Sequence, residues 1–147
     1  MESGFSTSLS TDLKDGCDNI WIVTAPLKYW SLLLGRMIVV PTWYEIESES
    51  ESPEDKEARF YTDFASVPRV PVFYALWGNI AHREATLHDY LYRKDSIPIV
   101  AKSHADRVFL EAMKSTGKSW YLRYPMYLGV VLAGSGAYHK RRVRDKL

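Results

Sequence analysis

The sequence predicts an α+β domain, with a small antiparallel β-sheet in the N-terminal part and about three helices in the C-terminal half. Two observations support this fold class. β-branched and aromatic residues dominate two short segments before residue 47, which is typical of half-buried strands. From about Pro71 onward, the apolar residues recur with helical spacing, and Gly and Pro divide this part of the chain into pieces.

Length and composition fit a single domain over residues 1–147. Of the 147 residues, 46% are hydrophobic and 14% are aromatic, so the chain can form a sizeable core. The formal net charge is +1, which gives no general electrostatic reason to expect nucleic acid as a partner. Cys17 is the only cysteine, so an internal disulfide bond and a zinc site built on cysteines are excluded.

The two expected strands are residues 19–25 and 36–46, and we expect them to pair antiparallel. Pro41 lacks the N–H group that a ladder hydrogen bond needs, so it should lie at an edge, a bulge or a strand end. We interpret residues 29–35, which lie between the two segments, as a short apolar connection.

Three polar segments should lie at the surface. Residues 1–18 begin with neither a basic stretch nor an apolar run, so we expect a polar arm and no signal peptide. Residues 45–57 contain seven acidic residues and one Lys, which predicts an exposed acidic insertion. Residues 139–147 contain five basic residues and one Asp, which predicts a solvated basic tail, with docking onto a partner as the alternative.

The helical half should contain helices over about residues 79–94, 101–116 and 119–133. Asn79 can cap the free N–H groups at the start of the first helix. Gly117 suits the left-handed backbone conformation that often ends a helix, so the second helix should stop there.

The third helical segment, residues 119–133, is apolar enough to raise the question of a membrane span. Spanning needs about 20 apolar residues, whereas Arg123 interrupts this run. Pro125 should kink the helix or force it to restart. We therefore expect a core helix and no transmembrane span. The alternative is a helix at a membrane surface, with its Trp and Tyr at the headgroups and the basic tail beside it.

The first helix carries a histidine on its apolar side. At about 100° per residue, Ala81, Ala85, His88 and Tyr92 fall on one stripe, so His88 should point inward with Tyr92 one turn away. Asp89 lies on the flank of this stripe, where it can face a cleft.

The second helix carries a carboxylate on its apolar side, because Asp106 shares a stripe with Phe109 and Met113. Burying this carboxylate without a partner would cost several kcal/mol. A short connection makes the two helices antiparallel neighbours, so the expected partner is His88, with Tyr92 as a second donor. A carboxylate fixes the tautomer of an imidazole and raises its basicity, which suits a general base acting on water. The alternative is a satisfied polar network in the core.

Prolines stiffen the loop over residues 61–71, in which Thr62, Asp63 and Ser66 can bond backbone amides. Asp63 and Arg69 could supply a metal ligand or an anion clamp beside the histidine-bearing helix. The alternative is a structural turn capped by the Asp side chain.

Three motifs occur in a fixed order: TDFASVPR at Thr62–Arg69, HDYLY at His88–Tyr92 and ADRVFLEAM at Ala105–Met113. In these motifs the chain resembles the phage-associated domain-of-unknown-function family 1353, over roughly residues 19–138. The resemblance implies a protein encoded by a bacteriophage or prophage and implies no established reaction. The acidic insertion departs from the shorter connection that is usual in this family.

The paired helices are also similar, more weakly, to those of phospholipase A₂-like enzymes. That resemblance implies that His88 is the water-activating base and Asp89 a calcium ligand. It also implies that Asp106 orients His88 and bonds to Tyr92. The glycine-rich calcium loop of those enzymes is absent, so residues 62–71 would have to substitute for it.

Two functional hypotheses follow. The first is a phage-encoded hydrolase-like protein in which His88 and Asp106 activate water on lipid or cell-wall bonds. Calcium or another divalent cation would assist at Asp89 and Asp63. The residues expected to bind substrate are Arg69, Ser66 and Thr62.

The second hypothesis is a non-catalytic virion component, in a tail or connector, whose partners are phage structural proteins or a second copy of the chain. Both hypotheses place the protein in the virion or the host bacterial cytoplasm. A membrane surface is a further candidate partner. Nucleic acid is not favoured, because only the tail is strongly basic.

Overall fold

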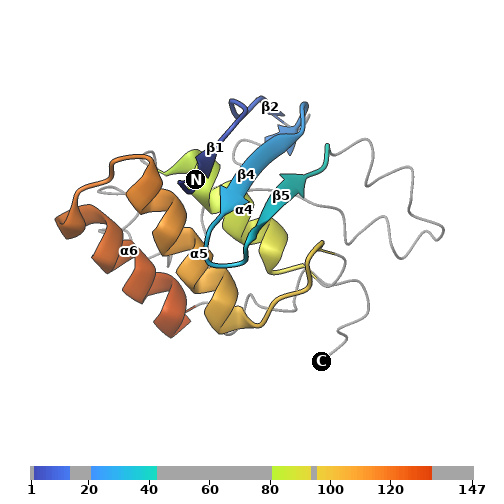
Figure 1. Cartoon of the computed structure of the whole chain (residues 1–147). Coiled ribbons are helices and arrows are strands. Elements are labelled where there is room, and N and C mark those ends of the chain that lie inside the picture. Colours follow the sequence, from blue (N-terminus) through green and yellow to red (C-terminus); the bar gives the residue numbers. More distant parts are fainter. Residues whose placement is uncertain (1, 14–20, 43–80, 94–95, 134–147) are drawn as a thin grey trace.

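The computed structural model of the chain describes residues 2–13, 21–42, 81–93 and 96–133. Within these residues the fold is α+β, as the sequence predicts (Figure 1). Short antiparallel strands come first, and helices follow in the C-terminal half.

The strands form two small antiparallel sheets. The three-stranded sheet contains β1 (Gly4–Phe5), β4 (Leu27–Ser31) and β5 (Arg36–Val40), with β4 in the centre. The two-stranded sheet pairs β2 (Thr11–Leu13) with β3 (Trp21–Val23).

The strand pairing differs from the prediction. The described parts of the expected strands 19–25 and 36–46 do not pair with each other, because β3 pairs with β2 and β5 pairs with β4. β4 lies largely in the segment expected as an apolar connection. A hairpin between β4 and β5 closes only a short loop, which costs little chain entropy, and Gly35 provides the left-handed conformation in the turn with φ +63°. Pro41 follows the last residue of β5, at a strand end as predicted.

Part of the segment expected as a polar arm belongs to the sheets. Gly4 and Phe5 lie opposite Trp30 and Tyr29 of β4. The Phe5 ring packs 4.7 Å from the Tyr29 ring, measured between centroids. Thr7 Oγ1 accepts a hydrogen bond from the Lys28 N–H at 2.8 Å. Backbone pairing does not require an apolar sequence, so a polar composition alone did not reveal these short strands.

The three described helices are α4 (His82–Leu91), α5 (Lys102–Ser115) and α6 (Trp120–Ala133). Their positions agree with the three predicted ranges to within a few residues. Ala81 occupies the N-cap position of α4 and makes no side-chain cap hydrogen bond. Asn79, the expected cap, lies outside the described residues.

Gly117 ends α5 as predicted. Its φ is +77°, and its N–H donates to the Lys114 carbonyl at 3.1 Å while the Lys118 N–H donates to the Met113 carbonyl at 3.0 Å. This pair of bonds is a Schellman motif, which satisfies carbonyls that the helix leaves free. Pro125 lies inside α6, and the helix continues through it.

α5 is the central helix, since it packs against α4 on one side and against α6 on another (Figure 1). α4 and α5 also contact β4, whereas α6 lies on the side of α5 away from the strands. The main core lies between the sheets, α4 and α5, and a second cluster lies between α5 and α6. The second cluster consists of Ala81, Phe109, Met113, Met126 and Val130.

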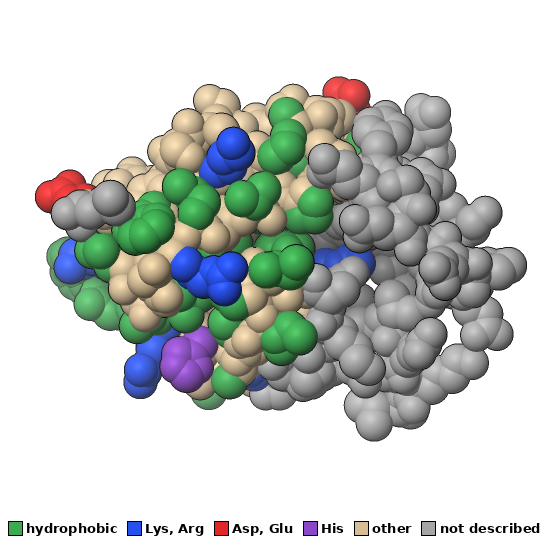
Figure 2. All heavy atoms as spheres, turned by 45° about the vertical axis from the view of Figure 1, so that its right-hand side comes forward, with side chains coloured by type: hydrophobic (Ala, Val, Ile, Leu, Met, Phe, Trp, Pro, Cys, Tyr) green, Lys and Arg blue, Asp and Glu red, His purple; other side chains and the backbone are tan. Residues whose placement is uncertain are grey.

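Several large apolar side chains remain at the surface. In the hairpin they are Leu32, Leu33, Met37 and Val39. Figure 2 shows one face of the molecule on which hydrophobic side chains reach the surface among Lys and Arg. Of the helices that the structure describes, none is long and apolar enough to cross a membrane.

Candidate functional site

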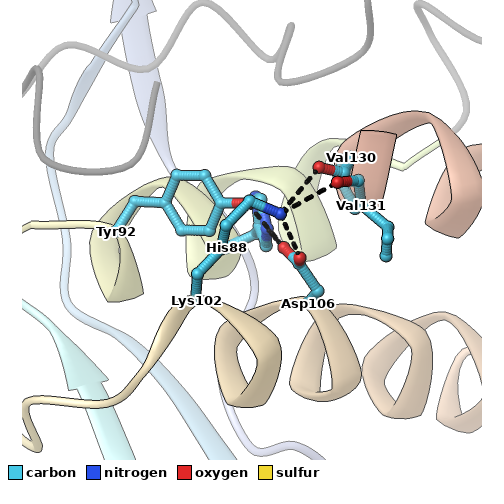
Figure 3. Close-up of polar contacts among 6 residues, drawn as sticks. All are labelled: His88, Tyr92, Lys102, Asp106, Val130 and Val131. Atoms are coloured by element: carbon cyan, nitrogen blue, oxygen red, sulfur yellow. Dashed lines mark hydrogen bonds and ion pairs between the residues drawn. The ribbon is translucent and has the colours of Figure 1, made fainter. Parts of the chain in front are cut away.

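Asp106 of α5 receives hydrogen bonds from His88 of α4 and from Tyr92, the C-cap residue of that helix (Figure 3). His88 Nε2 lies 2.8 Å from Asp106 Oδ1, and the Tyr92 hydroxyl donates to the same oxygen at 2.5 Å. His88 and Tyr92 are one turn apart on α4, which packs against α5, so both side chains reach one carboxylate. The contacts predicted from the helical projection are therefore present.

This cluster lies inside the protein. His88 is 0% exposed, and Tyr92 and Asp106 are each 2% exposed. The His88 ring packs against the rings of Tyr92 and Phe109, at centroid distances of 4.1 and 5.0 Å. Aromatic contacts on two sides hold the imidazole in one orientation.

The hydrogen bond to Asp106 fixes the tautomer of His88. An ionised carboxylate only accepts hydrogen bonds, so Nε2 carries the hydrogen. Nδ1 is also buried, and it has no hydrogen-bond partner among the described residues. In the neutral ring, Nδ1 carries the lone pair that accepts a proton. The geometry thus provides an oriented base with one nitrogen that is unpaired within the part of the chain that the structure describes.

Lys102 is a member of the cluster that the sequence analysis missed. Its Nζ donates to Asp106 Oδ2 at 2.7 Å and to the carbonyls of Val130 and Val131, both at 3.2 Å (Figure 3). Both carbonyls lie in the last turn of α6, where the helix supplies no N–H partner. A cation is also favourable there because of the helix dipole. Lys102 therefore connects Asp106 with the C-terminal end of α6.

Opposing effects act on the pKa of Asp106. Burial raises it, because the charged form loses hydration, whereas hydrogen bonds from His88, Lys102 and Tyr92 favour the charged form. The hydrogen bonds together outweigh burial, so the pKa of Asp106 lies below its ordinary value. Asp106 is consequently ionised at neutral pH.

Of the remaining predicted site residues, the structure describes only Asp89. Asp89 is buried on α4, with 2% exposure. Within the described residues, no group of three or more His, Cys, Asp and Glu could hold a metal ion. The structure does not describe the loop residues, so their roles as cation ligand and binding residues stay predictions. These are Thr62, Asp63, Ser66 and Arg69.

A second carboxylate of α5, Glu111, binds the hairpin. Its Oε1 accepts hydrogen bonds from the Tyr29 hydroxyl at 3.0 Å and the Ser31 hydroxyl at 2.8 Å, and its Oε2 accepts one from the Leu33 N–H at 2.9 Å. Burial and the Glu111 charge raise the pKa of Tyr29 above its ordinary value. Sequence spacing gave no sign of this contact, because its partners lie about 80 residues away.

A third carboxylate, Glu84, joins the start of α4 to the end of α5. It is 1% exposed, and it accepts a hydrogen bond from the Thr116 hydroxyl. Lys118 Nζ lies 3.4 Å from Glu84 Oε1. The ionic and hydroxyl partners satisfy a buried charge, which is a structural role.

A family model described as "Protein of unknown function (DUF1353)" matches residues 44–130, more than half of the chain. The matched range includes His88, Tyr92 and Asp106. No curated protein and no solved structure matches the chain.

Proposed function

The chain belongs to the DUF1353 family of proteins of unknown function, and we propose that it is a hydrolase-like protein in which His88 activates water. The proposed substrates are lipid or cell-wall bonds. The phage-associated character of the family it resembles favours a bacteriophage or prophage as the source. The observation that carries the proposal is the arrangement around His88, with one ring nitrogen bonded to Asp106 and the other without a partner among the described residues.

The proposed reaction uses the two nitrogens of His88 differently. Nδ1 takes a proton from water while the water oxygen attacks the carbonyl carbon of an ester or amide. The same nitrogen then returns the proton to the leaving alcohol or amine as the bond to carbon breaks. Nε2 keeps its hydrogen bond to Asp106, whose negative charge stabilises the imidazolium formed between the two steps.

The ion pair of the cluster fixes the orientation of this base. Lys102 Nζ lies 2.7 Å from Asp106 Oδ2, while the other carboxylate oxygen of Asp106 is bonded to His88 Nε2. Lys102 is therefore a positioning residue that acts on His88 through Asp106.

Catalysis also requires that water and substrate reach Nδ1. His88 has no exposed surface, so the proposed mechanism includes a step that opens the protein beside α4. Diethyl pyrocarbonate, which acylates accessible imidazoles, tests this step. We expect slow but complete modification of His88 in the native protein, after fast modification of the exposed His104.

A role for a divalent cation rests only on the ligand residues that the sequence analysis named. Calcium binds six to eight oxygen ligands, and among the described residues Asp89 is the one candidate ligand that the resemblance names. Because no metal-binding group forms within the described residues, the proposed steps use the side chains of His88, Asp106 and Lys102 alone.

The test compares His88→Ala with His104→Ala on a panel of phospholipid vesicles, soluble carboxylic esters and purified peptidoglycan, each with calcium chloride and with EDTA. Removing a general base typically costs about 10²–10⁴-fold in rate, so we expect a loss in this range for His88→Ala and an unchanged rate for His104→Ala. Absence of wild-type activity on every substrate, or full activity of His88→Ala, contradicts the proposal.

A second candidate function is that of a non-catalytic virion component, and the burial of His88, Tyr92 and Asp106 favours it. A buried polar network can serve only to fix the packing of helices, and Asp106 with Lys102 connects α4, α5 and α6. On this view the protein is present in purified phage particles, detected by mass spectrometry, and His88→Ala particles assemble and infect normally. Absence from the particles contradicts this candidate.

A further inference from the structure

α6 leaves an apolar stripe of its surface uncovered. Tyr121, Tyr124, Leu128 and Leu132 are 59%, 46%, 53% and 80% exposed. Their spacing of three, four and four residues places them along one side of the helix. Trp120, at 68% exposure, extends this stripe at the N-terminal end, where its ring meets that of Tyr121 edge-on at 5.9 Å.

This stripe is separate from the side of α6 that forms the core. Met126 and Val130 are 3% and 0% exposed and pack with Phe109 and Met113 of α5. A surface helix in a soluble protein usually carries polar and charged residues on its outer side. α6 instead carries Tyr and Leu there, and a contiguous exposed apolar patch of this kind marks an interaction site.

The one charged residue of α6 is basic. α6 contains Arg123, whose guanidinium lies 5.3 Å from the centre of the Tyr124 ring, and it contains no acidic residue. Arg107 and Lys114 are exposed on α5, the helix against which α6 packs. The two carboxylates of α5 are engaged with partners on neighbouring elements or within the helix.

Positive charge beside the stripe disfavours a second copy of the chain as the occupant. In a twofold dimer the same patch meets itself, so the Arg123 side chains of both copies would enter one interface as like charges. A partner surface that is both apolar and negatively charged fits better. The interface of an anionic lipid bilayer has these two properties.

The length of α6 determines how it would meet such a bilayer. Its 14 residues span about 21 Å, which is shorter than the roughly 30 Å hydrocarbon core of a bilayer. Over its described residues the helix is therefore too short to cross the membrane, and it can lie in the plane of the interface. Tyr and Trp rings suit the headgroup level, and Leu side chains reach the acyl chains.

We infer that α6 docks onto an anionic lipid surface through the stripe of Trp120, Tyr121, Tyr124, Leu128 and Leu132. The basic side chains of α5 and α6 contact the lipid phosphates in this arrangement. The inference does not depend on the proposed hydrolase, because lipid binding needs neither His88 nor a reaction.

The test measures co-sedimentation of the full chain with vesicles of phosphatidylcholine alone and with vesicles that contain equal parts of phosphatidylglycerol. The test variant is Leu128→Gln/Leu132→Gln, and the matched control is Leu32→Gln/Leu33→Gln, which changes two exposed leucines in the hairpin. All four leucines are exposed, so both proteins should keep the wild-type circular dichroism spectrum and melting temperature.

We expect the wild type to bind the anionic vesicles, with an affinity that weakens as salt is added. The affinity of Leu128→Gln/Leu132→Gln should be at least about tenfold lower. The hairpin control, Leu32→Gln/Leu33→Gln, should bind as the wild type does. Brominated lipids should also quench tryptophan fluorescence in the wild type, and less so in Trp120→Phe. The fluorescence measurement with Trp120→Phe tests the inference even if Leu128→Gln/Leu132→Gln does not fold.

Three outcomes would overturn the inference. They are absence of wild-type binding to anionic vesicles, equal binding by both double variants when both are folded, and a concentration-dependent dimer that the α6 variant abolishes while vesicle binding persists. The last outcome would identify the stripe as a contact between copies of the chain.

Discussion

Asp106 and Glu111 lie little more than one turn apart on α5, yet they bind opposite parts of the molecule. Asp106 accepts hydrogen bonds from His88, Tyr92 and Lys102, on the side where the helices pack. Glu111 accepts hydrogen bonds from two hydroxyls and one backbone N–H of the hairpin. One carboxylate therefore has an ionisable base and a cation as partners, whereas the other has neutral donors only.

The difference shows which carboxylate suits acid–base chemistry. A network around Glu111 can hold strands against a helix, but none of its donors changes its charge near neutral pH. The network around Asp106 includes an imidazole, a side chain that can act as a general base. Both carboxylates belong to α5 and both accept three hydrogen bonds, so the type of partner, rather than the number of hydrogen bonds, points to a functional site.

The largest effect should come from removing the carboxylate of Asp106. Asp106→Ala leaves Lys102, His88 and Tyr92 without their shared acceptor, and breaking a buried ion pair in this way costs roughly 3–5 kcal/mol of unfolding free energy. Urea denaturation followed by circular dichroism measures the loss. Asp12→Ala, at an exposed position of β2, serves as the control, and a cost below about 1 kcal/mol for Asp106→Ala would show that the network contributes little to stability.

A smaller loss of about 1–3 kcal/mol is expected for Glu111→Ala, because three donors of the hairpin lose a partly buried acceptor. The same change should lower the pKa of Tyr29 toward its ordinary value while burial keeps it raised, since the Glu111 charge is a contributing cause. Absorbance titration of phenolate formation measures the pKa, with Glu2→Ala as the control. An unchanged titration of Tyr29 would mean that burial alone raises its pKa.

Lys102→Met should cost about 1–2 kcal/mol, since it removes the cation from Asp106 and from the end of α6 but keeps most of the side chain's packing. The pKa of Asp106 should rise because one of its hydrogen bonds is lost. Lys114→Met changes an exposed lysine of the same helix and should be nearly neutral. If both variants are equally stable in urea, Lys102 does not support α6.

The smallest expected effects are changes of stability with pH. They have opposite directions at Asp106 and at Tyr29, the partner of Glu111. The pKa of Asp106 is lower in the folded protein than its ordinary value of 3.8, so its contribution to stability is present above that pH and is lost as acid protonates it. The pKa of Tyr29 is raised above 10.0, so its contribution is present below pH 10 and is lost as alkali ionises the unfolded chain.

Melting temperatures across pH measure both contributions as differences between the wild type and a variant. Asp106→Asn should flatten the loss of stability in acid, and Tyr29→Phe should flatten the loss in alkali. Asp12→Asn and Tyr121→Phe change exposed residues and should flatten neither. The comparison would be contradicted if Asp106→Asn flattened the loss of stability in alkali and Tyr29→Phe flattened the loss in acid.

Local sequence patterns predicted the helices and the contact between His88 and Asp106, because helical spacing decides which side chains share a face. They did not predict the strand pairing. Leu27, Tyr29 and Ser31 alternate inward in β4, but the apolar neighbours Leu32, Leu33 and Leu34 hid this alternation.

Contacts with distant partners left no local signal. The position of Lys102, one turn before Asp106, was visible as an ion-pair spacing, whereas its bonds to the Val130 and Val131 carbonyls depend on how α6 packs. The bond of Glu111 to the hairpin likewise depends on the tertiary structure. The sequence therefore located the site on its two helices but did not reveal what surrounds it.

The ammonium group of Lys102 has three hydrogens, and the structure gives it three acceptors. An amine reacts with an acylating or alkylating reagent through its free lone pair, which forms only when the ammonium loses a proton. Because each proton of Lys102 is held by an oxygen, this lysine should be labelled last when the native protein is treated with amine-directed reagents. A rise in its labelling rate would report that the end of α6 has separated from α5.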